Sequence, residues 1–122
     1  MIVLLLSLAG GLGAGARFVA DGLLRSRIRT ALPAGTMLIN TTGALLLGLL
    51  TGMVLAHQVG PELVAVLGTG FMGGYTTFST SSFETVRLIQ SGRIWFAVVN
   101  GLGTLILSVA AAACGLIVGG AL

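Results

Sequence analysis

Hydrophobic residues are concentrated in four long stretches of the chain, at residues 2–20, 34–56, 62–88 and 94–119, and short polar segments separate them. A transmembrane α-helix needs about 20 predominantly apolar residues to cross the hydrocarbon core of a bilayer. Each stretch is close to that length or longer. The pattern therefore predicts an all-α integral membrane protein with four transmembrane helices, very short loops and a single domain over residues 1–122.

The third stretch contains the most polar part of any predicted helix. Gly73 and Gly74 stand just before Thr76 and Thr77, and both residue types are poor helix formers. We therefore expect the third helix to break between Gly73 and Thr77. In hydrocarbon a break is tolerated only where the freed backbone groups meet protein, an ion or a water-filled path.

Hydroxyl side chains crowd around this expected break. They belong to Tyr75, Thr76, Thr77, Ser79, Thr80, Ser81 and Ser82. All can donate hydrogen bonds without carrying a charge, which suits a small anion better than a cation. A structural interpretation stands beside this one, because serine and threonine in membrane helices also bond to their own i−4 carbonyls or join helices. The cluster as a whole, beside a glycine break, favours function.

The composition agrees with a membrane protein whose helices pack closely. Only 7% of the residues are charged, 56% are hydrophobic and 20 of the 122 are glycine. Small residues allow membrane helices to approach one another closely. We expect tight packing at three glycine pairs with i, i+4 spacing: Gly11 and Gly15, Gly48 and Gly52, and Gly115 and Gly119.

Several classes of function are disfavoured by the residues present. Cys114 is the only cysteine and His57 the only histidine, which falls in a turn, so neither a metal framework nor a Ser-His-Asp enzyme site is expected. Nucleic acid is an unexpected partner because the chain has no basic run with interleaved aromatic residues.

A proton-coupled exporter of the small four-helix type is the alternative that we keep, although it needs an ionisable residue at membrane depth. A purely structural subunit would leave the hydroxyl cluster unexplained. A passive pore for a small ion fits best, and because four short helices enclose little, an oligomer is implied.

Three motifs carry a resemblance to a known family. The first helix reads Gly-Leu-Gly-Ala-Gly-Ala-Arg over residues 11–17, the second opens with Gly-Thr-Met-Leu-Ile-Asn over residues 35–40, and the third contains Gly-Gly-Tyr-Thr-Thr-Phe-Ser-Thr over residues 73–80. In this order and spacing, within four short helices, the chain resembles the bacterial Fluc-type fluoride channels, also called CrcB proteins. The resemblance covers nearly the whole chain.

The resemblance implies a passive fluoride channel in the cell membrane that exports fluoride and lowers its cytoplasmic concentration. Members of the family form antiparallel dimers with two fluoride pathways and a structural sodium ion at the centre of the dimer interface. By resemblance, the backbone carbonyls of Gly73 and Thr76 would hold the sodium ion. The fluoride pathway would then consist of Asn40, Phe78, Ser79, Thr80 and Ser81.

One position departs from the pattern that many members of the family share. A second phenylalanine often follows the first by three residues, and here that position holds Ser81, with Phe83 two residues further on. Phe83 lies about 200° around a helix from Ser81, so it does not simply substitute. Further candidates for a vestibule or a polar track are Arg17, Thr77, Asn100, Thr104 and Ser108. For the last three, interhelical bonding is an equal alternative, and for Arg17 simple snorkelling from a position near the end of the first helix is another.

The arginines are distributed unequally between the two ends of the predicted bundle. Arg17, Arg25, Arg27, Arg29, Arg87 and Arg93 all fall towards the side that carries the first and third connections. The positive-inside rule then places those connections in the cytoplasm and both termini outside. A chain that forms an antiparallel homodimer must insert both ways, which this bias opposes. We therefore expect a paralogous partner of opposite orientation, with a dual-topology homodimer as the alternative, and membrane lipid around either dimer.

Overall fold

The computed structural model describes residues 1–27, 33–56 and 60–122, and helices account for nearly all of them. The helical elements in chain order are α1 (Ile2–Arg27), α2 (Ala34–Leu55), α3 (Pro61–Val64), η1 (Ala65–Met72), α4 (Gly73–Tyr75), α5 (Ser79–Gln90), α6 (Ile94–Val98), η2 (Val99–Gly103) and α7 (Thr104–Ala121). The two η elements are π-helical. The described residues contain no β-strand.

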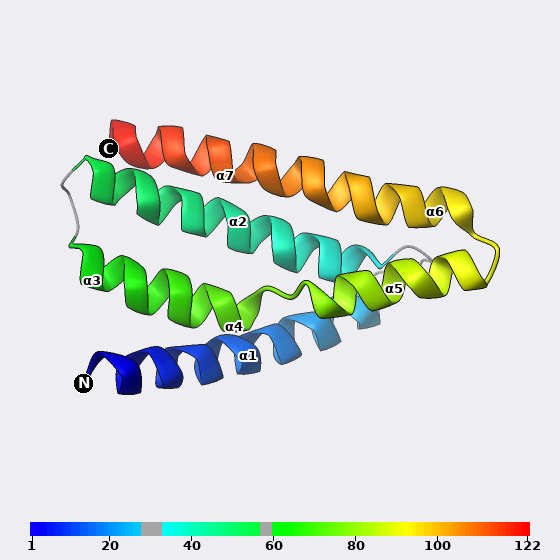
Figure 1. Cartoon of the computed structure of the whole chain (residues 1–122), viewed down its shortest axis with the longest axis horizontal. Coiled ribbons are helices and arrows are strands. Elements are labelled where there is room, and N and C mark those ends of the chain that lie inside the picture. The colour runs from blue at the N-terminus through cyan, green and yellow to red at the C-terminus, as the bar shows by residue number, and fades with distance from the viewer. Residues whose placement is uncertain (28–32, 57–59) are drawn as a thin grey trace.

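These elements join into long rods that run back and forth along one axis (Figure 1). Elements α3, η1 and α4 follow one another without interruption, as do α6, η2 and α7. The segments long and apolar enough to cross a membrane are α1, α2 and the continuous helix Ile94–Ala121. Both chain termini lie at the same end, as Figure 1 shows. The prediction of an all-α membrane protein with a break in the third helix is confirmed.

The first helix is longer than predicted. We expected it to stop at residue 20, but α1 continues to Arg27. Leucine and arginine are good helix formers, and Arg25 forms an i, i+4 ion pair with Asp21 at 3.1 Å. Basic residues in the last turn also complement the helix dipole. The predicted polar connection is therefore helical up to Arg27. Arg29, and His57 with its predicted turn, lie outside the described residues.

The most extensive helix contact among the described elements is between α2 and α7. A Cβ atom added at Gly48 or Gly52 would collide with the backbone carbonyl of Ala112 or Leu116. A Cβ atom added at Gly115 or Gly119 would likewise collide with the backbone carbonyl of Leu45 or Leu49 in α2. Two of the three predicted glycine pairs therefore do bring two helix backbones into contact.

The third glycine pair does not pack against another described helix of this chain. A Cβ atom added at Gly11 or Gly15 would meet nothing within 4 Å. Instead, Gly13 lies against the Phe71 carbonyl of η1, while Gly74 of α4 lies against the Gly10 carbonyl. Gly11 and Gly15 each lie two residues from Gly13, about 200° around the helix, so they point away from the neighbouring rod.

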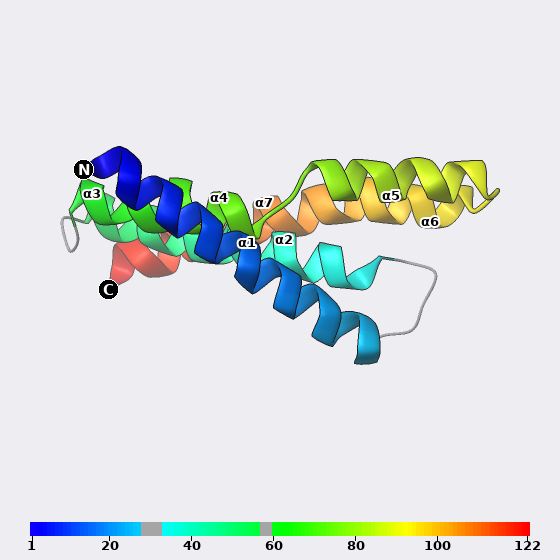
Figure 2. The ribbon, with the colours of Figure 1, turned by 90° about the horizontal axis from the view of Figure 1, so that it is seen from below.

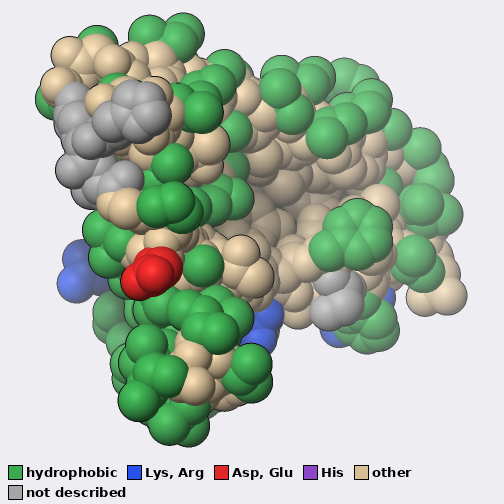
Figure 3. Space-filling view, turned by 60° about the vertical axis from the view of Figure 1, so that its left-hand side comes forward, with side chains coloured by type: hydrophobic (Ala, Val, Ile, Leu, Met, Phe, Trp, Pro, Cys, Tyr) green, Lys and Arg blue, Asp and Glu red, His purple; other side chains and the backbone are tan. Residues whose placement is uncertain are grey.

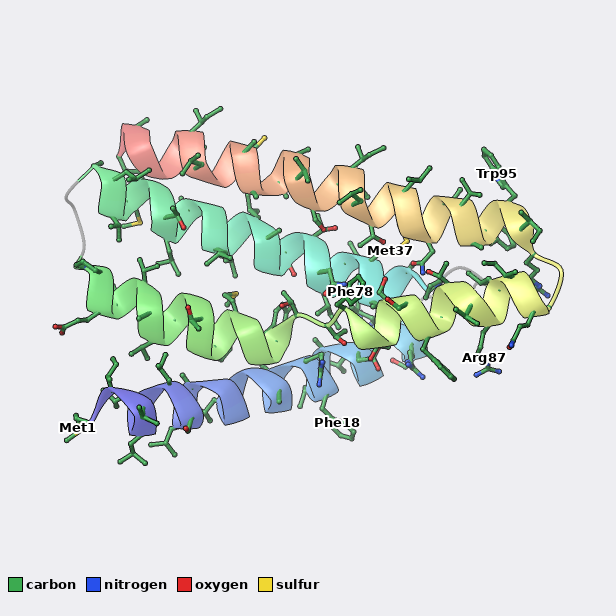
Figure 4. All side chains as sticks on the ribbon, in the orientation of Figure 1. Met1, Phe18, Met37, Phe78, Arg87 and Trp95 are labelled. Atoms are coloured by element: carbon green, nitrogen blue, oxygen red, sulfur yellow. The ribbon has the colours of Figure 1, made fainter. Side chains whose placement is uncertain are left out.

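The outer surface is mostly apolar. Hydrophobic side chains cover much of the face seen in Figure 3, and charged ones are few there. Figure 2 shows that α1 leans away from α5 and α6 towards its C-terminal end. Trp95, at the start of α6, points away from the bundle in Figure 4 and is 73% exposed. This surface suits contact with lipid, with an aromatic residue near one interface.

Candidate functional site at the helix break

The break lies slightly later than the two glycines suggest. Tyr75 ends α4, Ser79 begins α5, and Thr76 between them has an extended backbone with φ −81° and ψ 159°. The last closed helical turn before the break is the bond from the Thr76 N–H to the Met72 carbonyl, at 2.8 Å. Gly73 and Gly74 remain helical, and the missing side chain of Gly74 allows the close contact with α1. The predicted region thus contains the break.

Asn40 of α2 reaches the break directly. Its Nδ2 atom donates to the Thr77 carbonyl at 2.8 Å, and the Thr77 N–H donates to Asn40 Oδ1, also at 2.8 Å. A side-chain amide is neutral and has both a donor and an acceptor, so it can pair with both backbone groups of one residue. The bond to Thr77 uses one of the two hydrogens on Nδ2. The other remains suited to a further acceptor.

The threonine hydroxyls around the break form two kinds of hydrogen bond, one back to the preceding helix and one forward to the first turn of α5. The Thr76 hydroxyl donates to the Met72 carbonyl at 2.9 Å, which is the ordinary i−4 bond of membrane threonines. The Thr77 hydroxyl instead accepts the Thr80 N–H at 3.2 Å, and it also bonds the Thr80 hydroxyl at 3.2 Å. Thr77 therefore caps the first turn of α5. The structure does not describe the side chain of Ser79.

The two phenylalanines that follow the extended residue of the break are exposed. Phe78 is 86% exposed, and its ring projects beside the break in Figure 4. Phe83 is exposed too, with the Arg87 guanidinium 5.9 Å from its ring centre. Ser81 is half-buried, and its carbonyl accepts a hydrogen bond from Asn100 at 3.3 Å. Phe83 and Ser81 thus have different surroundings, as the helical geometry requires.

The polar stripe on the last rod faces the interior. Asn100 is fully buried, Thr104 is buried and Ser108 is half-buried. Within the described part of the chain, buried oxygen atoms of all three lack a hydrogen-bond partner. Elsewhere hydroxyls bond to the i−4 carbonyl, namely those of Ser7, Thr42, Thr51 and Thr85. Interhelical bonding therefore accounts for the amide nitrogen of Asn100, but it does not account for Thr104 or Ser108.

Three further polar residues face the interior and were not among the candidates. Thr36 is buried and lies near the half-buried Glu84 carboxyl. Thr41 Oγ1 and Glu84 Oε1 are buried, and the described residues give neither a partner. Helical spacing could have found two of them, since Thr36 lies four residues before Asn40 and Glu84 three residues after Ser81.

A cavity opens at the end of the bundle that carries the arginines. Its volume is about 360 Å³, and it lies between the start of α2 and the turn that joins α5 to α6. The lining residues are Pro33, Glu84, Arg87, Leu88, Ser91 and Arg93. Two guanidinium groups against one carboxylate give this opening a positive balance, which attracts anions.

We expected Arg17 to lie near the end of its helix, but it does not. It is half-buried, and α1 ends ten residues later at Arg27. Ten residues of helix span about 15 Å at 1.5 Å per residue. Arg17 is therefore further from the helix end than predicted, because α1 continues through the residues predicted to form a loop, and both interpretations of its role stay predictions. Arg17 stands one helical turn after Gly13, which contacts Phe71 close to the break.

The fold and the polar break together define a multi-pass membrane protein with an interior lined mainly by uncharged hydrogen-bonding groups. A sequence profile of the family described as "CrcB-like protein, Camphor Resistance (CrcB)" matches residues 4–116, so the chain belongs to this family. The resemblance seen in its motifs is thereby confirmed.

Relatives with high identity span nearly the whole chain. A protein of Leifsonia xyli subsp. xyli named "Fluoride-specific ion channel FluC 1" is 52% identical over 120 residues, which cover 98% of this chain and 88% of the relative. A Cutibacterium acnes protein named "Fluoride-specific ion channel FluC 2" is 45% identical over 120 residues, or 98% of each chain. A Pyrococcus horikoshii protein named "Fluoride-specific ion channel FluC" is 41% identical over 100 residues, or 81% of this chain and 80% of the relative.

Proposed function

We propose that this chain is a subunit of a fluoride-selective passive channel that exports fluoride and lowers its cytoplasmic concentration. The observation that carries the proposal is the interior row of uncharged donors, in which the oxygens of Thr104 and Ser108 have no hydrogen-bond partner among the described residues. A strongly hydrated anion needs many hydrogen-bond donors in place of water, yet a buried fixed cation would hold it too firmly to pass. The names of the relatives supply the identity of the ion.

In this proposal the fluoride pathway includes Asn40 and the residues that follow the break. The remaining hydrogen on Asn40 Nδ2 would donate to the anion beside the ring of Phe78. A ring edge is the positive end of the aromatic quadrupole, so it can meet an anion without binding it tightly. Ser79, Thr80 and Ser81 continue the polar track, and the positively balanced cavity beside Arg87 and Arg93 serves as a mouth.

The exposed break supports a dimer. Phe78 is 86% exposed, and a Cβ atom added at Gly73 would meet nothing within 4 Å. Freed backbone groups do not face lipid in a stable membrane protein, because hydrocarbon offers them no hydrogen-bond partner. A second subunit packed against this face in antiparallel orientation would cover them and would bring two breaks together.

A structural sodium ion at that junction fits the residues of the break. The described residues contain no cluster of histidine, cysteine or carboxylate side chains that could hold a metal ion. Backbone carbonyls released by an unwound helix are the alternative oxygen ligands for a sodium ion in membrane proteins. The carbonyls of Gly73 and Thr76 would hold the ion, and its charge would stabilise the junction of the two breaks.

The proposal is tested by measuring efflux from liposomes loaded with fluoride or with chloride. The chain is reconstituted alone and together with a paralogous subunit. We expect fluoride efflux that needs no proton gradient and chloride efflux at least 100-fold slower. Comparable chloride flux would exclude a fluoride-selective channel. Flux that requires a proton gradient would favour the exporter instead, with the inward-facing Glu84 as its ionisable residue.

A further inference from the structure

Two hydrogen bonds at the break replace two that a continuous helix would make. In an α-helix each N–H donates to the carbonyl four residues earlier. The Thr77 N–H would therefore close on the Gly73 carbonyl, and the Thr80 N–H on the Thr76 carbonyl. In the structure the Thr77 N–H donates to Asn40 Oδ1 at 2.8 Å, while the Thr80 N–H donates to the Thr77 hydroxyl at 3.2 Å.

The two carbonyls that lose these donors are those of Gly73 and Thr76. We infer that Asn40 and Thr77 are positioning residues for the cation site, because their side chains divert the two N–H groups that would otherwise close on its carbonyl ligands. This inference rests on the sodium site of the proposed function. It assigns to Asn40 a role on the backbone in addition to its role as a donor to fluoride.

The chemistry of both side chains suits this role. An N–H that loses its helical acceptor inside a membrane is strongly unfavourable unless it finds another acceptor. Asn40 Oδ1 supplies that acceptor, and Nδ2 of the same amide satisfies the Thr77 carbonyl at 2.8 Å. The Thr77 hydroxyl supplies the acceptor for the Thr80 N–H. The last closed turn, from the Thr76 N–H to Met72, ends immediately before the released Gly73 carbonyl.

The position of the break also follows from these bonds. Thr77 is buried, so its side chain and backbone are held among neighbouring helices and do not contact lipid. Gly43 of α2 lies against the Thr76 side chain, in the turn that follows Asn40. The face of α2 that carries Asn40 therefore holds the break in two ways. Gly43 contacts the Thr76 side chain, and the side-chain amide of Asn40 pairs with the Thr77 backbone. Without the amide, the Thr77 N–H has the Gly73 carbonyl as its nearest helical acceptor.

The test measures sodium binding separately from fluoride flux. Thermal unfolding of the solubilised channel is recorded over a sodium titration at constant ionic strength, with N-methylglucamine as the replacement cation. The variants are Asn40→Leu, which has a similar volume and no amide, and Thr77→Val, which has a similar shape and no hydroxyl. Thr77→Ser keeps the hydroxyl. Thr51→Val is the matched control, since the Thr51 hydroxyl bonds only to Leu47 of its own helix among the described contacts.

We expect sodium to raise the unfolding temperature of the wild type. Asn40→Leu and Thr77→Val should need at least tenfold more sodium for half of that effect, while Thr77→Ser and Thr51→Val stay within twofold of the wild type. If Asn40→Leu fails to fold, the comparison of Thr77→Val with Thr77→Ser decides. Unchanged half-saturation in folded Asn40→Leu and Thr77→Val would overturn the inference and leave Asn40 as a fluoride donor only.

The same preparation distinguishes this inference from the proposed function. A wild type that releases fluoride but shows no sodium-dependent stabilisation overturns the inference and leaves the channel function standing. A wild type that sodium stabilises but that passes no fluoride overturns the channel function, while the variants still decide the inference.

Discussion

The amide nitrogen of Asn100 lies 3.3 Å from the carbonyl oxygen of Ser81 and 2.7 Å from the Thr85 hydroxyl, so one side chain of η2 binds two successive turns of α5. The Thr85 hydroxyl in turn donates to the same Ser81 carbonyl at 2.9 Å. These bonds fix α5 against the last rod directly after the break. They also keep the backbone of the half-buried Ser81 against the last rod.

Replacing Asn100 with leucine should lower fluoride flux with little loss of stability. Interhelical hydrogen bonds in membranes contribute about 0.6 kcal/mol each on average, and the substitution also removes a buried oxygen that lacks a partner among the described residues. The two effects oppose each other, so we expect a stability change within about 1 kcal/mol. Efflux assays and thermal unfolding of the same variant check this. Unchanged flux would reduce Asn100 to a purely structural contact.

Removing the hydroxyls of Thr104 and Ser108 should lower fluoride flux without lowering the stability of the fold. Thr104→Val and Ser108→Ala delete oxygens that have no partner in the described structure. Stability should therefore stay within about 0.5 kcal/mol, since no intramolecular bond is lost, while fluoride flux falls at least tenfold. Thr51→Val serves as the control, because it loses a bond to Leu47 on its own helix and should keep its flux. Equal flux in all three variants would remove the stripe from the pathway.

Phe78→Ile should abolish or strongly reduce flux while dimer assembly remains intact. The substitution keeps an apolar side chain of considerable bulk but removes the positive ring edge. Phe18→Ile is a matched control, because Phe18 is also highly exposed, at 80%, and points away from the bundle on α1 (Figure 4). Efflux and size-exclusion chromatography are measured on both. Normal conduction by Phe78→Ile would mean that the pathway runs elsewhere.

Much of the fold could be predicted from the sequence, because hydropathy alone specifies membrane helices. The break was also predictable, since adjacent glycines and threonines are poor helix formers. The pairing of Asn40 with Thr77 was not, because it joins residues 37 positions apart and depends on how α2 meets the third rod. The end of α1 was misplaced for a different reason: a polar segment of good helix formers remains helical outside the hydrocarbon.

The glycine contacts between α2 and α7 should be intolerant of any side chain. In Gly115→Ala the new methyl would collide with the Leu45 carbonyl, so the two backbones must separate. Overpacking of this kind costs about 1–3 kcal/mol. Gly22→Ala is the control, because its new methyl would meet nothing within 4 Å and alanine favours a helix. Thermal unfolding in detergent should show a lower transition only for Gly115→Ala, and equal transitions would contradict the packing.

The orientation of the chain in the membrane should be single, with both termini outside the cell. The structure gathers Arg25 and Arg27 at the end of α1, and Arg87 and Arg93 around the turn from α5 to α6, at the end opposite the two termini. The acid Glu62 lies at the other end, in the first turn of α3. The positive-inside rule counts arginines in short loops, and here they are all at one end of the described structure. Such a bias opposes insertion in both directions.

An antiparallel dimer then requires a partner with the opposite charge bias. We therefore expect the chain expressed alone to give a C-terminal topology reporter signal from outside only, and little fluoride efflux. Co-expression with a paralogous subunit should restore efflux without changing this orientation. Reducing the charge bias should allow insertion in both orientations. In the double variant Arg87→Gln with Arg93→Gln, fewer positive charges remain at that end, so part of the chain expressed alone should insert in the opposite orientation. Signals from both sides together with full efflux by the unmodified chain would exclude the obligatory heterodimer and would establish a dual-topology homodimer.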